Sequence, residues 1–91
     1  RIQAEAGDAE AQNELGHLYW QGKDVPKDDK MAALWYHKAA TQGYAAAQYN
    51  LGVLYANAKQ YTHARHWWNK AQAQDNQDAK DALAKLDEMG L

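Results

Sequence analysis

The sequence predicts an all-α protein built from repeated antiparallel helix pairs. Two segments 36 residues apart are edited copies of one another: GDAEAQNELGHLYWQG at residues 7–22 and GYAAAQYNLGVLYANA at residues 43–58. A fixed period of roughly 20–50 residues is typical of stacked repeats. Within each copy the shared positions recur mainly at intervals of three and four, as on one face of an α-helix. The eight identical pairs are Gly7/Gly43, Ala9/Ala45, Ala11/Ala47, Gln12/Gln48, Leu15/Leu51, Gly16/Gly52, Leu18/Leu54 and Tyr19/Tyr55.

The first helix pair is predicted from capping residues and helical spacing. Asp8 is a candidate N-cap for a helix over residues 9–21, because its carboxylate can accept hydrogen bonds from the first free backbone N–H groups. Gly22 suits the left-handed position that follows a helix. After a connecting loop, Asp28 is expected to cap a second helix over residues 29–42. The inner faces of the two helices carry Ala11, Leu15 and Leu18, and Ala32, Trp35, Tyr36 and Ala39.

The second helix pair repeats this plan with a shorter loop. Its helices are expected over residues 45–58 and 61–73. The segment WYHKA at residues 35–39 recurs as WWNKA at residues 67–71, at an offset of 32 instead of 36. Four residues have therefore been lost from the loop, which is reduced to Lys59–Gln60.

A last helix is expected over residues 77–89, with Asp75 or Asn76 as its N-cap. Its outer face is more polar than those of the earlier helices, which is typical of a helix that caps a repeat array. At the other end, IQAEAG aligns with KAATQG of the first unit, so we expect the end of a preceding helix. The predicted organisation is one domain over residues 1–91, divided into the end of a preceding helix (1–6), a first repeat (7–42), a second repeat (43–74) and a C-terminal capping helix (75–91).

Gly16 and its equivalent Gly52 lie in the middle of predicted helices, where glycine is less favourable than alanine by about 1 kcal/mol. Their recurrence indicates that a neighbouring helix approaches too closely for a Cβ atom. Aromatic residues at helical spacing are expected to fill the core, with a ligand cage as the alternative. These residues are Tyr19, Trp35, Tyr36, Tyr55, Trp67 and Trp68.

Residues 15–55 closely resemble the Sel-1-like repeat family, a branch of the tetratricopeptide-like α-solenoids. The resemblance implies a right-handed superhelix of antiparallel helix pairs that acts as an adaptor or scaffold, and we expect a bacterial member. Some bacterial members are secreted and rich in cysteine, a subgroup that this cysteine-free chain does not fit. The matching positions are Ala11-Gln12, Leu15-Gly16, Tyr19, Gly22, Val25-Pro26, Asp28, Ala32, Trp35-Tyr36, Lys38-Ala39-Ala40 and Gln42-Gly43.

The candidate binding site is the concave groove, which in such solenoids is lined by the first helix of each pair. Its positions differ between repeats while the core positions between them are identical, as expected of a surface free to specialise. Asn amides can pair with a peptide backbone, and Trp and Tyr supply buried anchor area. The alternatives are that Trp20 packs over the loop and that the Asn side chains are simply solvated. The candidates are Glu10, Asn13, Glu14, His17, Trp20, Tyr49, Asn50, Val53, Asn57 and Lys80, with Asp81 and Lys85 nearby.

Composition excludes several functional classes. The net charge of −2 gives no basic face for nucleic acid, and no apolar run approaches the roughly 20 residues needed to span a membrane. The chain contains neither Ser nor Cys, the commonest covalent nucleophiles. His63 and His66 lie one helical turn apart but have no third ligand at a matching spacing, so no metal and no cofactor is expected. Both the cytoplasm and an extracytoplasmic location are compatible with this composition.

We therefore expect a non-catalytic interaction module that presents a shallow groove to a peptide or partner protein. One alternative is a structural spacer within a longer repeat scaffold. Another is a β-lactam-binding or hydrolysing protein, as the resemblance to the cysteine-rich members implies, although the chain lacks a Ser or Cys nucleophile for it.

Overall fold

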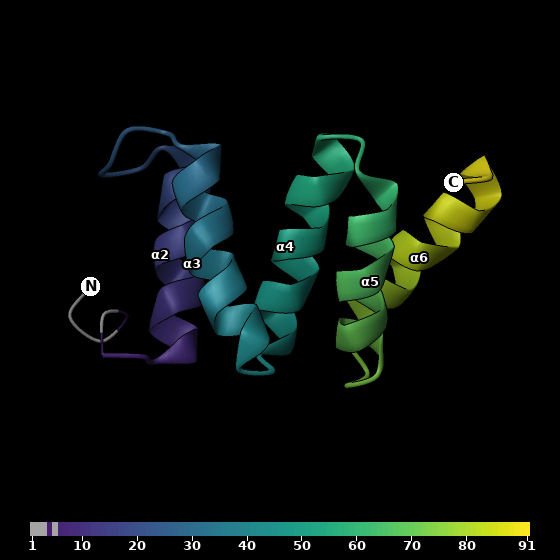
Figure 1. The fold of residues 1–91 in the computed structure, drawn as a ribbon, viewed down its shortest axis with the longest axis horizontal. Helices are drawn as coiled ribbons and strands as arrows, with labels where there is room; N and C mark the ends of the chain where they lie inside the picture. Colours follow the sequence, from purple (N-terminus) through teal and green to yellow (C-terminus); the bar gives the residue numbers. More distant parts are fainter. Residues whose placement is uncertain (1–3, 5) are drawn as a thin grey trace.

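The computed structural model describes Ala4 and residues 6–91 as a row of α-helices (Figure 1). This part of the chain contains no strand and has dimensions of 40 × 25 × 17 Å. The helices are α2 (Ala9–Gln21), α3 (Asp29–Thr41), α4 (Ala45–Asn57), α5 (Tyr61–Gln72) and α6 (Gln77–Met89). The prediction of an all-α protein is confirmed. The expected end of a preceding helix at residues 1–6 falls largely outside the described residues.

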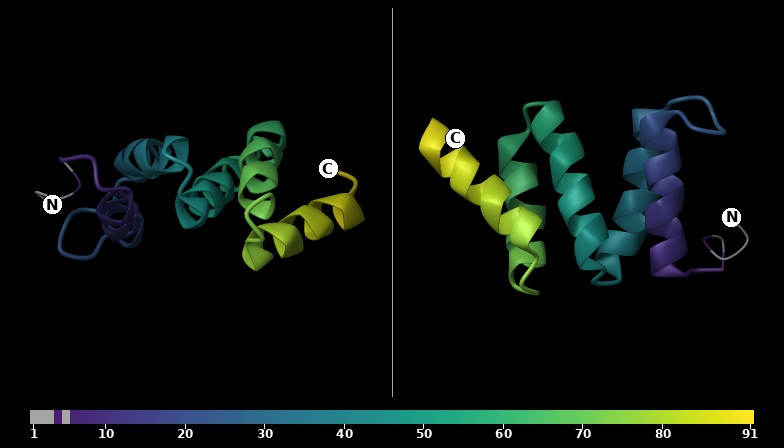
Figure 2. Two further views of the ribbon diagram at one scale, coloured as in Figure 1. Left: turned by 90° about the horizontal axis from the view of Figure 1, so that it is seen from below. Right: turned by 180° about the vertical axis from the view of Figure 1, so that it is seen from behind.

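The helices form two layers, because each one runs antiparallel to the helix before it and packs against it. Helices α2, α4 and α6 occupy one layer, and α3 and α5 occupy the other (Figure 2, left). Viewed from behind, α2 and α4 lie in front of α3 and α5 (Figure 2, right). This is the predicted right-handed α-α solenoid, and it places the first helix of each pair on a common surface.

The predicted caps form, with small shifts at the helix ends. Asp8 accepts from the backbone N–H of Ala11 at 3.1 Å, and Asp28 accepts from the N–H groups of Lys30 and Met31. Of the two candidates for the last helix, Asn76 is the cap, and Asp75 takes a left-handed φ of 65°. Three helices end one residue earlier than predicted, at Thr41, Asn57 and Gln72.

The neighbouring helix leaves no room for a Cβ atom at either mid-helix glycine, as predicted, and in both cases an aromatic ring fills the space. A Cβ atom on Gly16 would lie 2.7 Å from Cδ1 of Tyr36, and one on Gly52 would lie 2.5 Å from Cδ1 of Trp68. Tyr36, Trp68 and Trp35 are buried, so the core interpretation holds for them. The other three aromatic residues of the predicted set are only partly buried: Tyr19, Tyr55 and Trp67.

Two buried glutamines tie each helix pair to the segment before it, a role that was not predicted from the sequence. Gln48, only 4 % exposed, donates from Nε2 to the carbonyl of Ala40 at 3.1 Å and accepts from Nε2 of Gln74 at 3.1 Å. Gln12 makes the equivalent bonds to the carbonyl of Ala4 and to Gln42. Both carbonyls also accept from the backbone N–H three residues later, so each glutamine amide adds a second hydrogen bond to a carbonyl oxygen that can accept two.

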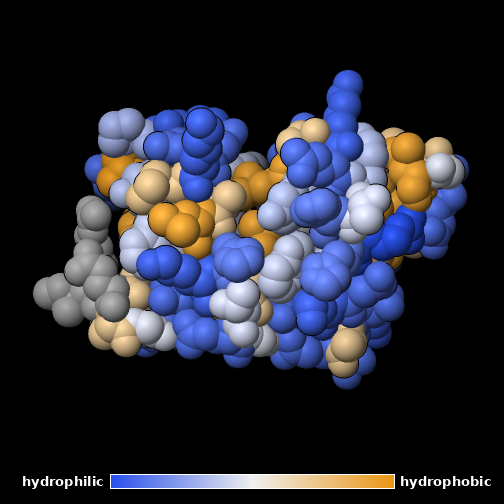
Figure 3. All heavy atoms as spheres, viewed as in Figure 1, coloured by the Kyte–Doolittle hydropathy of each residue, from blue (hydrophilic) through white to orange (hydrophobic). Residues whose placement is uncertain are grey.

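The two loops within the pairs differ as predicted. The loop of the first pair extends away from α4 (Figure 1), whereas residues 58–60 close the second pair with Lys59 at a φ of 62°. A hollow of about 510 Å³ lies between α3 and the carboxyl end of α4. Apolar surface is visible at this place within a largely hydrophilic face (Figure 3).

Candidate functional site: the face of α2, α4 and α6

The face formed by α2, α4 and α6, here called the groove face, carries a continuous row of depressions. One depression, with a volume of about 220 Å³, lies between α2 and α4, and another of about 410 Å³ lies between α4 and α6. Tyr49 and Val53 line both, so α4 forms the wall between them. A third hollow, of about 550 Å³, lies beside Asn13 and Glu14 and extends the row along α2.

Tyr36 and the side chains of α2 and α4 form the depression between these two helices. Tyr36 reaches it from α3 because Gly16 leaves room for its ring. The hydroxyl of Tyr36 lies 3.4 Å from Nδ1 of His17. Across the groove, Nδ2 of Asn50 donates to Oδ1 of Asn13 at 3.0 Å, which links the two helices. These polar groups can exchange partners with a peptide backbone without leaving a buried group unpaired.

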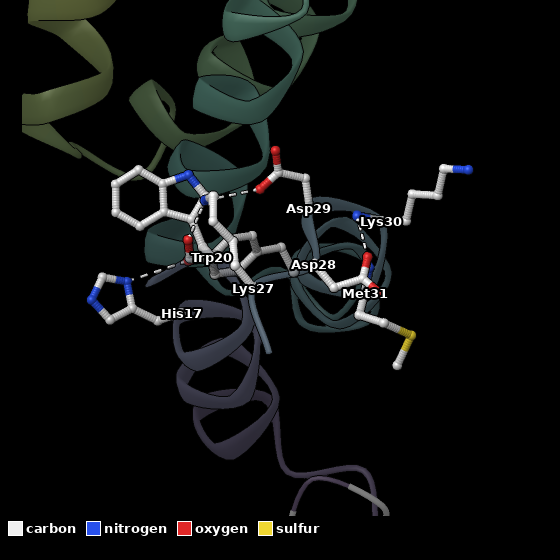
Figure 4. Close-up of polar contacts among 8 residues, drawn as sticks. His17, Trp20, Lys27, Asp28, Asp29, Lys30 and Met31 are labelled. Carbon is white, nitrogen blue, oxygen red and sulfur yellow. Dashed lines mark hydrogen bonds and ion pairs between the residues drawn. The ribbon is translucent and has the colours of Figure 1, made fainter. Parts of the chain in front are cut away.

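Trp20 stands at the edge of this depression and is 36 % exposed. Its indole is stacked with His17 at a centroid distance of 5.8 Å, and Nζ of Lys27 lies 5.4 Å from the ring centroid (Figure 4). Lys27 also donates to the Trp20 carbonyl and forms an ion pair with Asp29 at 3.2 Å. The alternative expected for Trp20, packing against the loop, therefore holds for one side of the ring, while the side chain still lines the groove.

Apolar side chains from three helices form the depression between α4 and α6. Trp68 reaches it from α5, where the missing Cβ of Gly52 makes room for the indole. Its Nε1 donates to the carbonyl of Tyr49 at 3.0 Å, and its rings stack with the Tyr49 ring at a centroid distance of 6.4 Å. Leu86 and Met89 of α6 complete the opposite wall.

Acidic side chains affect both tyrosines at the amino-terminal edge of the groove face. Burial raises the pKa of Tyr49, and the nearby carboxylates of Asp78 and Asp81 raise it further. Burial also raises the pKa of Tyr44, with added contributions from acidic residues at the start of α2. Acidic side chains therefore lie near these tyrosines at the end of the groove face where α2, α4 and α6 begin (Figure 1).

Most of the predicted groove residues lie together. Glu10 and Lys80 line none of the depressions described above, and Lys80 forms an ion pair with Asp75 at 3.6 Å. The role of all ten in binding stays a prediction. The eight that line a depression are Asn13, Glu14, His17, Trp20, Tyr49, Asn50, Val53 and Asn57.

Part of the α4–α6 depression was not predicted from the sequence. Trp68 was expected in the core, with a ligand cage as the alternative, although its equivalence to Tyr36 across the repeats could have placed both rings beneath the groove. The contribution of α6 was also underestimated, although its lining residues follow the spacing of one helix face. Of the α6 residues that line the depression, Asp81 and Lys85 were expected near the groove, and Asp78, Ala82, Leu86 and Met89 were not.

The buried Tyr36 predicts a loss of stability at high pH. Burial raises its pKa from 10.0 to about 12, so the folded protein holds the neutral hydroxyl more strongly than the unfolded chain does. This contribution is fully present below pH 10 and is lost as the pH rises from 10 through 12. Urea unfolding over this range should show a smaller decline in the free energy of unfolding for Tyr36→Phe than for the wild type. Parallel declines would contradict the assignment to Tyr36.

Comparison with known proteins identifies the repeat. The family model described as Sel1 repeat matches residues 9–44 and residues 45–76. The chain belongs to the Sel1 repeat family. The two matched segments correspond to the helix pairs α2–α3 and α4–α5, and the second segment is shorter by the four residues lost from its loop.

Two curated relatives are longer proteins. A putative sel1-like repeat-containing protein of Acanthamoeba polyphaga mimivirus is 36 % identical over 69 residues, which are 76 % of this chain and 13 % of the relative. Chitin synthase regulatory factor 4 of Schizosaccharomyces pombe is 29 % identical over 85 residues, which are 92 % of this chain and 13 % of that protein. The chain thus spans about an eighth of these relatives.

Solved structures share the fold. A Sel1 repeat protein from Oxalobacter formigenes superposes with a TM-score of 0.88 at 37 % identity, over 93 % of this chain and 37 % of that one. The protective antigen c5321 of uropathogenic Escherichia coli, which has the same repeat fold, gives a TM-score of 0.91 at 39 % identity, over 98 % of this chain and 20 % of that one. Within the described residues, no helix is long and apolar enough to cross a membrane.

Proposed function

We propose that this Sel1-repeat domain is a non-catalytic adaptor that binds a segment of a partner protein along its groove face. The observation that carries the proposal is the continuous row of depressions between α2, α4 and α6. Aromatic and apolar side chains form its walls, and Asn13 and Asn50 place amide groups along it. Such a mixture of apolar anchor sites and amides suits an extended or helical peptide.

The proposed affinity is modest. Two helix pairs offer a short groove, and buried area alone does not set affinity. Most of the binding free energy is expected from a few well-packed anchors, as in other protein interfaces. Trp20 and Val53 are suitable positions for testing this, because both line depressions and neither lies in the buried core.

The test is selection of peptides from a random library displayed on phage, followed by affinity measurements with the synthesised peptides. A Trp20→Ala/Val53→Asp variant should lose most of the binding. Leu34→Ala, which truncates an exposed apolar side chain of α3, is the matched control and should bind as the wild type does. Circular dichroism verifies that each variant is folded. Equal binding by the groove variant and the wild type would overturn the proposal and favour the role of a structural spacer.

A further inference from the structure

We propose that the depression between α4 and α6 takes an apolar side chain of the partner and that Asp78 and Asp81 at its rim contact a nearby lysine or arginine of the same peptide. This inference rests on the proposed function and adds the chemistry of the partner. It follows from the shape of the depression, from the balance of charges around it and from the position of Tyr49 between the two.

The depression as a whole is large enough for an apolar anchor. Its volume of about 410 Å³ lies within the roughly 300–1,000 Å³ of pockets that bind small ligands. Val53 of α4, the Trp68 ring and Leu86 of α6 line it. Met89, which also lines it, is 60 % exposed, and a flexible thioether can adapt to side chains of different shape.

The charges around the depression are acidic overall. Three charged residues line it: Asp78, Asp81 and Lys85. In the part of the chain that the structure describes, neither aspartate forms an ion pair, and the polar contact of Asp81 is a hydrogen bond from Nε2 of Gln77 at 3.0 Å. Two carboxylates against one ammonium group leave the rim with a net negative charge that a cationic side chain would balance.

Tyr49 connects the apolar wall to the acidic rim. Its ring lines the depression and stacks with Trp68, while its hydroxyl is near enough to Asp78 and Asp81 for both carboxylates to raise its pKa. A lysine or arginine at this point would meet two carboxylates and the face of an aromatic ring. Both attract a cation.

The acidic character continues along the groove face. Glu14 lines the hollow on α2, and Glu10 lies one turn earlier on the same helix. Because α2, α4 and α6 all begin at the same end of the molecule, these charges share one edge (Figure 1). Such an edge attracts a basic segment before contact and loses this effect as salt screens the charges.

Helix stability gives a competing reason for one of the acids. Asp78 lies in the first turn of α6, where a carboxylate interacts favourably with the helix dipole. That explanation does not extend to Asp81, which lies beyond the first turn. The single Asp81→Asn variant therefore separates recognition of a cation from stabilisation of the helix.

The experiment repeats the peptide selection with the wild type and with an Asp78→Asn/Asp81→Asn variant. Peptides selected with the wild-type protein should be enriched in Lys or Arg close to an aliphatic or aromatic residue. The double variant should bind these peptides about 5- to 30-fold more weakly, since each rim contact is worth up to about 1 kcal/mol. The Asp81→Asn change alone should account for part of this loss, and higher salt should reduce the difference.

The matched control is Asp24→Asn/Glu88→Gln, which removes the same charge at two exposed positions that line none of the depressions. Wild-type binding by this control is expected. Peptides that depend on Trp20 and Val53 but show no cationic preference would overturn this inference and leave the proposed function standing. An equal loss in the control and the rim variant would also overturn it, because only net charge would then matter. A library that yields no binder would overturn both.

Discussion

Replacing Gly52 with alanine should lower the free energy of unfolding by about 2 kcal/mol, although alanine is the better helix former. The added Cβ would lie 2.5 Å from Cδ1 and 2.9 Å from Cε2 of Trp68. The indole is 5 % exposed and packs among Ala64, Ala71 and Leu83, so it cannot move aside freely. Overpacking of this kind costs about 1–3 kcal/mol.

Two further effects nearly offset each other in this variant. A displaced indole would lose the hydrogen bond from its Nε1 to the Tyr49 carbonyl, worth about 1 kcal/mol. In the opposite direction, the higher helix propensity of alanine stabilises α4 by about 1 kcal/mol. Urea unfolding followed by circular dichroism measures the sum. Asn69→Ala, at an exposed position of α5, is the control and should change stability by less than about 0.5 kcal/mol.

A double variant assigns the effect of Gly52→Ala to the indole. Trp68→Leu removes the ring that the new methyl group would strike, so the double variant should be more stable than the sum of the two single changes predicts. If the two changes in the free energy of unfolding simply add, the added Cβ atom does not contact Trp68. The close approach of α5 to α4 would then be contradicted. Because Trp68 also lines the α4–α6 depression, Gly52→Ala should weaken peptide binding as well.

The fold could be predicted from the sequence because positions that are identical in both repeats mark residues that pack against a neighbouring helix. Identical positions such as Leu15/Leu51 and Gly16/Gly52 are those where a neighbouring helix allows one shape, and all four are buried. Helix starts were predictable because a cap is a local feature: Asp28 bonds to residues two and three positions later. Helix ends were less predictable from the sequence. They depend on backbone hydrogen bonds to the carbonyl three residues earlier, such as the bond from the N–H of Gln42 to the carbonyl of Ala39.

The groove could be predicted only in part, because its floor comes from other helices. The variable positions of α2 and α4 were visible as differences between copies. Helix α6 has no matching copy, and of its lining residues only Asp81 and Lys85 were expected near the groove. Trp68 belongs to a core cluster and lines the groove at the same time, which requires three-dimensional contacts to recognise. Gln12 and Gln48 were identical in both copies, yet their partners lie eight and about thirty residues away, beyond the reach of local patterns.

Replacing Gln48 with leucine should also lower the free energy of unfolding by about 2 kcal/mol. Leucine has nearly the same size, so little cavity forms, but a buried hydrogen bond to the Ala40 carbonyl and a partly buried one from Gln74 are lost. Each contributes about 0.5–1.5 kcal/mol. The loss is limited because Ala40 still accepts from the N–H of Gly43, and Gln74 still donates to the Gly43 carbonyl at 2.8 Å.

The region in which Gln48→Leu lowers local stability shows whether Gln48 links the two repeats or acts as a general core contact. Gln48 of α4 joins the end of α3 to Gln74, which follows α5, so its removal should increase amide hydrogen exchange at the α3–α4 junction more than in the middle of α5. Gln72→Ala, an exposed change in α5, should leave both stability and exchange nearly unchanged. Uniformly faster exchange in the Gln48 variant would contradict the link. If the increase is confined to the junction, the glutamines fix how one helix pair is placed against the next, and with it the spacing of α2 and α4 across the groove.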